Sequence, residues 1–188
     1  DEWQLHAAWW LQPLAVSIAS YGLAAVAFLL LFMSAARRRR APLAFHVALA
    51  ALLSLFWAGM AAFSGAIDPR QVWLIDGPEV LRTAAWLLAL TAMGGAGAPR
   101  RRWLVALGIA AALQLSALAL PWVGAVHLTM MRLALAVTGM LLVEQVYRAA
   151  PPGARWGIKL ACLGIGALFA YDVYLYADAL LFQRVSID

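Results

Sequence analysis

The sequence predicts an all-α membrane protein, a polytopic transmembrane bundle of about six helices. Of its 188 residues, 65% are hydrophobic and 12% are charged, whereas a soluble domain has about 45–50% apolar and about 25% charged residues. A water-soluble fold of this length has too few charges to cover so much apolar surface. The composition therefore excludes an ordinary soluble enzyme, a nucleic-acid-binding module and a disordered segment. The lipid bilayer is the expected partner.

The amino-terminal segment, DEWQLHAAWWLQ, is too short and too polar to cross a membrane. Trp3, Ala7, Trp10 and Leu14 recur at helical spacing, and Trp9 adds another indole. Indole rings favour the headgroup level of a bilayer. We therefore expect a short interfacial helix before the first span.

Six apolar stretches follow. Because a helix of ~20 residues crosses the hydrocarbon core of a bilayer, we interpret each stretch as a membrane span. Pro13 is compatible with the first turn of a helix. The connection Ser64–Pro78 is polar, and its Asp76-Gly77-Pro78 sequence favours a turn. The predicted spans cover residues 13–34, 43–63, 79–93, 103–120, 127–147 and 156–182.

The basic residues predict the orientation, because cytoplasmic loops carry an excess of Lys and Arg. With the amino terminus outside, ten of the 14 basic residues lie inside: Arg37–Arg40, Arg100–Arg102, Arg148, Arg155 and Lys159. The other four lie on the outer side: Arg70, Arg82, Arg132 and Arg184. We therefore expect a multi-pass protein of a bacterial inner membrane with its amino terminus outside.

On insertion scales, an ionisable side chain at the centre of a span raises the free energy of membrane insertion by at least ~2.5–3.5 kcal/mol. Each such residue is therefore expected to have a structural or functional role. Arg82, Arg132 and Asp178 fall in one layer, roughly 5–8 Å below the outer interface at ~1.5 Å per residue. We expect Asp178 to be ionised and to bridge at least one of these arginines. Asp172 lies near mid-bilayer, and we expect it to be protonated and bonded to a Tyr or Trp. These groups could hold helices together through polar contacts, sense a ligand, or conduct protons or ions across the membrane.

The sixth span is the most informative segment. Tyr171, Tyr174 and Asp178 share one helix face, whereas Asp172 and Tyr176 share another. Small residues allow a neighbouring helix to approach closely, and they stand at Gly157, Ala161, Gly164, Gly166 and Ala170. We therefore expect a helix buried in the bundle with two polar faces that need partners.

At the inner side, Glu144 near the end of the fifth span and Lys159 near the start of the sixth form an expected structural ion pair. Glu144 also precedes Arg148 by four residues, a favourable helix spacing. The sequence has none of the glycine-rich, zinc-protease or nucleophile-elbow motifs of soluble enzymes. His46, His127 and the lone Cys162 have no metal-ligand spacing. We predict no catalytic, cofactor-binding or metal-binding residue in this chain.

A specific resemblance covers about residues 143–184. Its segments are VEQVYR at 143–148, the Pro-Pro turn at 151–152, RWGIK at 155–159, LGIGALFAYDVYLY at 163–176 and DALLF at 178–182. They are similar to the membrane region of the PEP-CTERM/exosortase-system sensor histidine kinases, the PrsK family. The resemblance implies that residues 1–188 form a single sensor domain. We expect the chain to be truncated before a further span and cytosolic GAF and kinase domains.

The resemblance also implies a homodimer, a cognate response regulator, and control of exopolysaccharide and PEP-CTERM protein-sorting genes. ATP would bind only in the kinase domain, so no catalytic residue carries over to this chain. Two other classes remain open: a small membrane transporter that uses Arg82, Arg132, Asp172 and Asp178, and a non-catalytic membrane scaffold. Kinase motifs beyond Asp188 would select the sensor, whereas a stop codon there would favour the other two.

Overall fold

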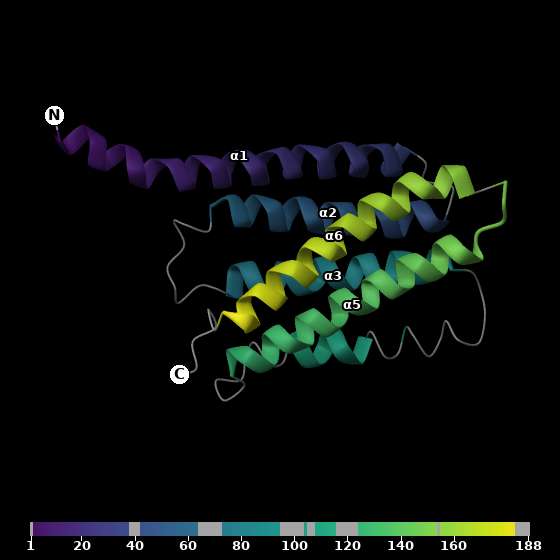
Figure 1. Ribbon diagram of the computed structural model, residues 1–188. Coiled ribbons are helices and arrows are strands. Elements are labelled where there is room, and N and C mark those ends of the chain that lie inside the picture. Colours follow the sequence, from purple (N-terminus) through teal and green to yellow (C-terminus); the bar gives the residue numbers. More distant parts are fainter. Residues whose placement is uncertain are drawn as a thin grey trace. The chain divides into compact units, whose positions relative to one another are not determined.

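The computed structural model describes residues 2–37, 42–63, 73–94, 104, 108–115, 124–153 and 155–182. These residues are helical apart from turns and helix ends, and they contain no strand. The helices are α1 (Glu2–Arg37), α2 (Pro42–Ala62), α3 (Trp73–Met93), α5 (Ala125–Ala149) and α6 (Arg155–Leu181) (Figure 1). Residues 104 and 108–115 are also helical. The predicted all-α class is confirmed.

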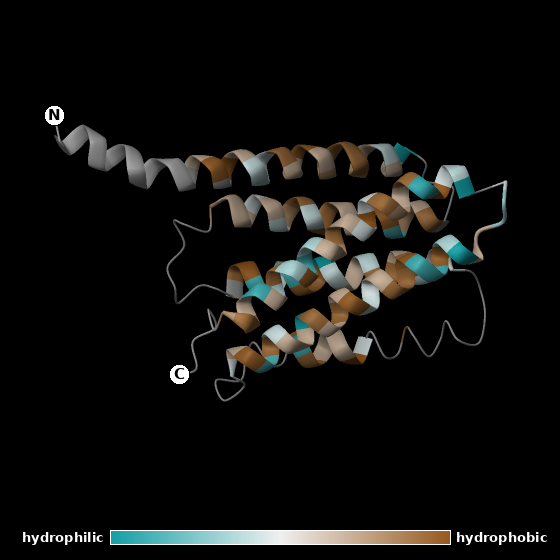
Figure 2. Ribbon diagram, viewed as in Figure 1, coloured by the Kyte–Doolittle hydropathy of each residue, from teal (hydrophilic) through white to brown (hydrophobic). Residues whose placement is uncertain are grey.

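Four helical segments of the described chain are long and apolar enough to cross a membrane: Ile18–Arg37, Leu43–Ala62, Ala125–Ala149 and Arg155–Leu181. Apolar residues cover most of the length of these helices, as Figure 2 shows. The segments correspond to the first, second, fifth and sixth predicted spans. This is the helix content expected of a membrane protein.

Helix α3 is not among these four segments. Asp76, Glu79 and Arg82 place three charges in its first ten residues. Half of the predicted fourth span, 103–120, lies outside the described residues.

Two helix starts differ from the prediction. Helix α1 runs unbroken from Glu2 to Arg37, so the expected interfacial helix is continuous with the first span and Pro13 lies inside it. Helix α3 begins at Trp73, so the turn expected at Asp76-Gly77-Pro78 is wrong. Asp76 lies in the first turn, where the helix dipole favours an acidic side chain. Pro78 is the sixth residue of α3, so the one bond that its missing N–H cannot make is to a carbonyl of the first turn.

The chain folds as two compact units, residues 1–82 and 83–188. In the first unit, α1 and α2 pack against each other along much of their length. Small side chains of α2 recur every three or four residues and are fully or almost fully buried: Ala50, Ser54, Ala58 and Ala61. Small residues let helices approach closely where lipid supplies no hydrophobic driving force between them. The most deeply buried face of α2 is therefore made of small side chains.

In the second unit, α5 and α6 form a hairpin across the turn at Pro151-Pro152-Gly153. The Nε–H of Arg155 donates to the carbonyl of Ala150 at 3.1 Å, which satisfies an acceptor at the end of α5. The buried residues of α5 are Leu135, Ala136, Gly139, Leu142 and Val146. Those of α6 are Cys162, Ile165, Phe169, Asp172 and Tyr176. Each helix therefore buries one narrow stripe.

The expectation that α6 is buried in the bundle is wrong for the described structure. Trp156, Tyr171 and Tyr174 are 82%, 53% and 67% exposed. Lipid can solvate an apolar helix face, so only the polar stripe needs protein partners. The glycines of α6 do not make the close approach: Gly157 and Gly164 have no neighbour near the position of a Cβ, and Gly166 would meet Val143 of α5 only at an ordinary contact distance of 3.7 Å. The close approach is at Gly139 of α5, against Phe169.

Hydroxyl groups within these helices bond to their own backbone. Each donates to a carbonyl three or four residues earlier, at 2.8–3.0 Å: Ser34, Ser54, Thr91, Thr129 and Thr138. This local bond satisfies a polar side chain in a segment surrounded by apolar groups. The hydroxyls therefore need no partner from another helix.

Candidate functional site

Among the described residues of the first unit, Arg82 of α3 is the most deeply buried charge. The side chain is 2% exposed, and its Cζ atom lies 4.1 Å from the centre of the Trp57 ring on α2. A guanidinium over an indole face is attracted by the ring quadrupole, and a desolvated pair is worth about 2 kcal/mol or more. Trp57 therefore compensates part of the cost of burying a group that is always charged.

Tyr21 of α1 extends this contact to a third helix. The rings of Tyr21 and Trp57 meet edge to face, with centroids 5.7 Å apart and planes at 83°. Such aromatic pairs add about 0.5–1.5 kcal/mol beyond the area they bury. We call Tyr21, Trp57 and Arg82 the Arg82 cluster. Through it, one cation links α1, α2 and α3.

Two further polar residues surround Arg82 along α3. Glu79 and Thr83 are 9% and 8% exposed, so the burial extends over more than one turn. Glu79 precedes Arg82 by three residues, and side chains at this spacing lie on the same side of a helix. The arrangement holds buried charge of both signs on one short segment. Buried side chains of this kind can bind a charged group or hold neighbouring helices together.

Arg82 was predicted from the sequence as a candidate site residue, whereas Trp57 and Tyr21 were not. The positions of the two aromatic residues along their helices could have identified them. Trp57 lies five residues before the end of α2, and Tyr21 lies three residues after the start of the apolar segment of α1. Under the predicted topology both fall near the same membrane surface as Arg82. Matching depth among aromatic as well as charged residues would have found the cluster.

The residues of the two faces predicted for α6 differ in exposure. Asp172 and Tyr176 lie in its buried stripe at 2% and 7% exposure, Tyr171 and Tyr174 are exposed, and Asp178 is partly buried. Asp172 is thus a buried carboxyl group in the stripe of α6 that packs within the protein. Its protonation and its bond to a Tyr or Trp stay a prediction.

Of the two partners that the sequence offers Glu144, the structure shows Arg148 and not Lys159. Glu144 pairs with Arg148 on its own helix, and the Nζ of Lys159 lies 5.3 Å from the centre of the Trp156 ring. The expected Glu144–Lys159 pair is therefore absent from the described structure. A partner one turn away on the same helix needs no approach of a second helix, which explains the preference. Both Glu144 and Arg148 are exposed, at 53% and 78%.

The predicted outer layer is divided between the two units. Arg82 belongs to residues 1–82, whereas Arg132 and Asp178 belong to residues 83–188 and are partly buried. The ionised bridge from Asp178 to an arginine stays a prediction. Among the described residues, no group of three or more His, Cys, Asp or Glu side chains could hold a metal ion.

Comparison with known proteins gives no assignment: no protein-family model, no curated protein and no solved structure matches this chain.

Proposed function

We propose that this chain is the membrane-embedded input region of a two-component sensor histidine kinase that controls exopolysaccharide and PEP-CTERM protein-sorting genes. The proposal rests on the resemblance of residues 143–184 to the PrsK family. The observation that carries it furthest is that α5 and α6, which hold nearly all of these residues, form one packed hairpin with Asp172 and Tyr176 in its buried stripe. Ionisable groups inside a span are rare unless they serve a function.

The proposed topology has six spans and an amino terminus outside the bacterial inner membrane. The ten-to-four distribution of basic residues supports this orientation. The Arg82 cluster supports α3 as a span despite its charges, because Trp57 offsets part of the desolvation cost of Arg82. Six spans are thus compatible with a chain that has four strongly apolar helices.

In this proposal the buried polar groups form the input machinery. Asp172 and Tyr176 lie where α6 packs, so a change in their bonding changes the contact of α6 with its neighbours. The Arg82 cluster does the same for α1, α2 and α3. The output would pass to cytosolic GAF and kinase domains, which bind ATP, dimerise and phosphorylate a response regulator.

The test uses the native gene product, purified from the membranes of its host and incubated with labelled ATP. The proposal predicts acid-labile phosphate on a histidine and transfer to a response regulator. Asp172→Asn should change the autophosphorylation rate at least about threefold, whereas Tyr174→Phe, on the exposed face, should leave it unchanged. A gene product that takes up no phosphate would overturn the proposal. Transport of an ion by the same protein in vesicles would then favour the transporter.

A further inference from the structure

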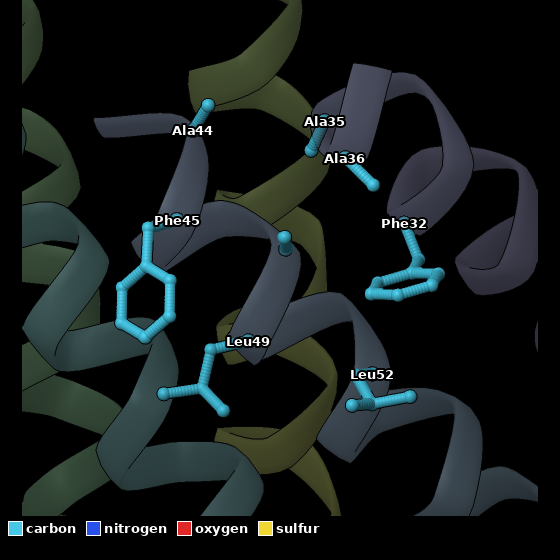
Figure 3. Close-up of a pocket in the computed structure, with 8 residues that line it drawn as sticks. Phe32, Ala35, Ala36, Ala44, Phe45, Leu49 and Leu52 are labelled. Carbon is cyan, nitrogen blue, oxygen red and sulfur yellow. The ribbon is translucent and has the colours of Figure 1, made fainter. Parts of the chain in front are cut away.

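A hollow between α1 and α2 has no role in the proposed function. It has a volume of about 400 Å³ and is lined by Phe32, Ala35 and Ala36 of α1 and by Ala44, Phe45, Ala48, Leu49 and Leu52 of α2. Figure 3 shows these residues, with Phe32 and Phe45 on opposite sides of the view and Leu49 between them. The volume falls within the range of small-ligand sites, roughly 300–1,000 Å³. We call it the α1–α2 groove.

The lining is wholly apolar, and part of it is open to the surroundings. The four alanines provide the space, while Phe45 and Leu52 are 68% and 44% exposed. An occupant must therefore be an apolar chain rather than a polar metabolite. Within a bilayer, the available apolar chains are those of lipids.

The position along the helices sets the length of the occupant. The lining residues of α2 run from Ala44 to Leu52, a distance of eight residues, and those of α1 end at Ala36, next to Arg37. At ~1.5 Å per residue, eight residues are about 12 Å. Half of a hydrocarbon core of ~30 Å is about 15 Å. The groove can therefore hold most of one acyl chain within one leaflet.

The positive charge beside the groove favours a lipid with an anionic headgroup. Arg37 lies in the last turn of α1, is exposed, and is the first of four consecutive arginines in the sequence. Basic residues at a membrane surface attract anionic lipids, with about 1 kcal/mol per Lys or Arg. A zwitterionic lipid would gain little from this charge.

We propose that the α1–α2 groove binds one acyl chain of an anionic phospholipid whose phosphate contacts Arg37. A lipid bound in this way would hold α1 against α2 beside Arg37. This inference does not depend on the kinase assignment, because it uses only the groove and the charge beside it.

The test is lipid binding to the purified 188-residue chain, followed by native mass spectrometry in detergent. Phosphatidylglycerol and phosphatidylcholine with identical acyl chains are compared, and we expect phosphatidylglycerol to bind at least about fivefold more tightly. Ala48→Phe fills the groove and should weaken binding of both lipids about tenfold. Arg37→Gln should weaken phosphatidylglycerol alone, by roughly fivefold, as expected for one lost charge contact. Ala27→Phe, at an exposed position of α1 outside the groove, is the matched control and should bind as the wild type does.

A second measurement locates the lipid when Ala48→Phe alters the helix content seen by circular dichroism. Phosphatidylglycerol with a photoreactive acyl chain should crosslink within residues 32–52, and Ala48→Leu should lower that yield. Equal binding of the two lipids, unchanged binding by the Ala48 variants, or crosslinks confined to other helices would overturn the proposal. Displacement of the lipid by inorganic phosphate would show a site for free anions and would also overturn it.

Discussion

The ring of Phe169 on α6 lies directly against the backbone of Gly139 on α5. A Cβ atom added to Gly139 would come within 2.6–2.7 Å of the Cδ1, Cε1 and Cε2 atoms of the ring. Phe169 is completely buried, so the ring has no free space to enter. This is the tightest approach shown by any described glycine of the chain, and it fixes how α5 and α6 pack.

Gly139→Ala should therefore destabilise the α5–α6 hairpin. Overpacking of a filled site costs about 1–3 kcal/mol, which outweighs the helix propensity of alanine over glycine, about 1 kcal/mol. Unfolding by titration with a denaturing detergent, followed by circular dichroism, measures the change. Gly164→Ala is the control, because no described atom is near the added methyl group. The control should be neutral or slightly stabilising, and equal stability of the two variants would contradict the contact.

The Arg82–Trp57 contact should appear as a coupling energy. A double-mutant cycle with Arg82→Met and Trp57→Leu isolates this term, and we expect about 1–2 kcal/mol because Arg82 is desolvated. Lys159 and Trp156 provide the comparison, since Trp156 is exposed and the distance is longer. Their cycle should give about 0.5 kcal/mol. A coupling at Arg82 no larger than this would argue against the Arg82 cluster as a stabilising unit.

Substitutions at Asp172 should separate a protonated from an ionised carboxyl. If the group is neutral, Asp172→Asn keeps a hydrogen-bonding side chain of the same shape and retains most of the stability. Asp172→Leu removes the polar group and leaves its partner unsatisfied, at a cost of about 1–3 kcal/mol. Thermal unfolding in detergent compares the two, with the exposed Tyr174→Phe as control. A loss in Asp172→Asn as large as in Asp172→Leu would mean that the charge itself is required.

Glu144→Gln should have little effect on stability. The Glu144–Arg148 pair is exposed and spaced by four residues, a geometry worth about 0.3–0.5 kcal/mol. High salt should remove even this difference, because exposed charges are screened. The charge exchange Glu144→Lys with Lys159→Glu should show no coupling beyond the sum of the single changes. Recovery of folded protein in the double variant would restore the pair that the sequence suggested.

The topology can be tested with single cysteines. Cys162 is the one cysteine of the sequence, so Cys162→Ser gives a background free of thiols. In that background, Ser64→Cys should react with a membrane-impermeant maleimide added to intact cells, and Arg37→Cys should react only after lysis. This follows from an amino terminus on the outer side with its arginine-rich connection inside. Labelling of Arg37→Cys in intact cells would reverse the orientation.

Helices were predictable where the sequence gives long apolar stretches between polar ends. Three predicted spans match α2, α5 and α6 to within two residues at every boundary. The start of α3 was not predictable, because Asp76-Gly77-Pro78 has the composition of a turn and also suits the first turns of a helix. A helix was predicted at the amino terminus, but its continuity with the first span was not, because Pro13 suits the start of a new helix.

The candidate site was predictable only in part. The cost of a charge in a span draws attention to Arg82 and Asp172 from composition alone. Their surroundings depend on which helices are neighbours, which the spacing within one helix does not reveal. Trp57 and Gly139 were missed on these grounds, since an indole and a glycine in an apolar segment have many ordinary roles. Lys159 was predicted to pair with Glu144 on another helix, whereas in the structure it lies near Trp156 on its own helix.

The buried stripes of α5 and α6 also limit how these helices can move. On α6 the intervals from Cys162 to Tyr176 are three, four, three and four residues, a heptad period of 3.5 rather than the 3.6 of a straight helix. Such a seam drifts by about 20° per heptad along a straight helix, so a left-handed winding of α6 on α5 keeps these residues in contact best. Sliding α6 along α5 must then also rotate it, as in a screw. An axial push on α6 would thus carry Tyr171 and Tyr174 around the helix axis.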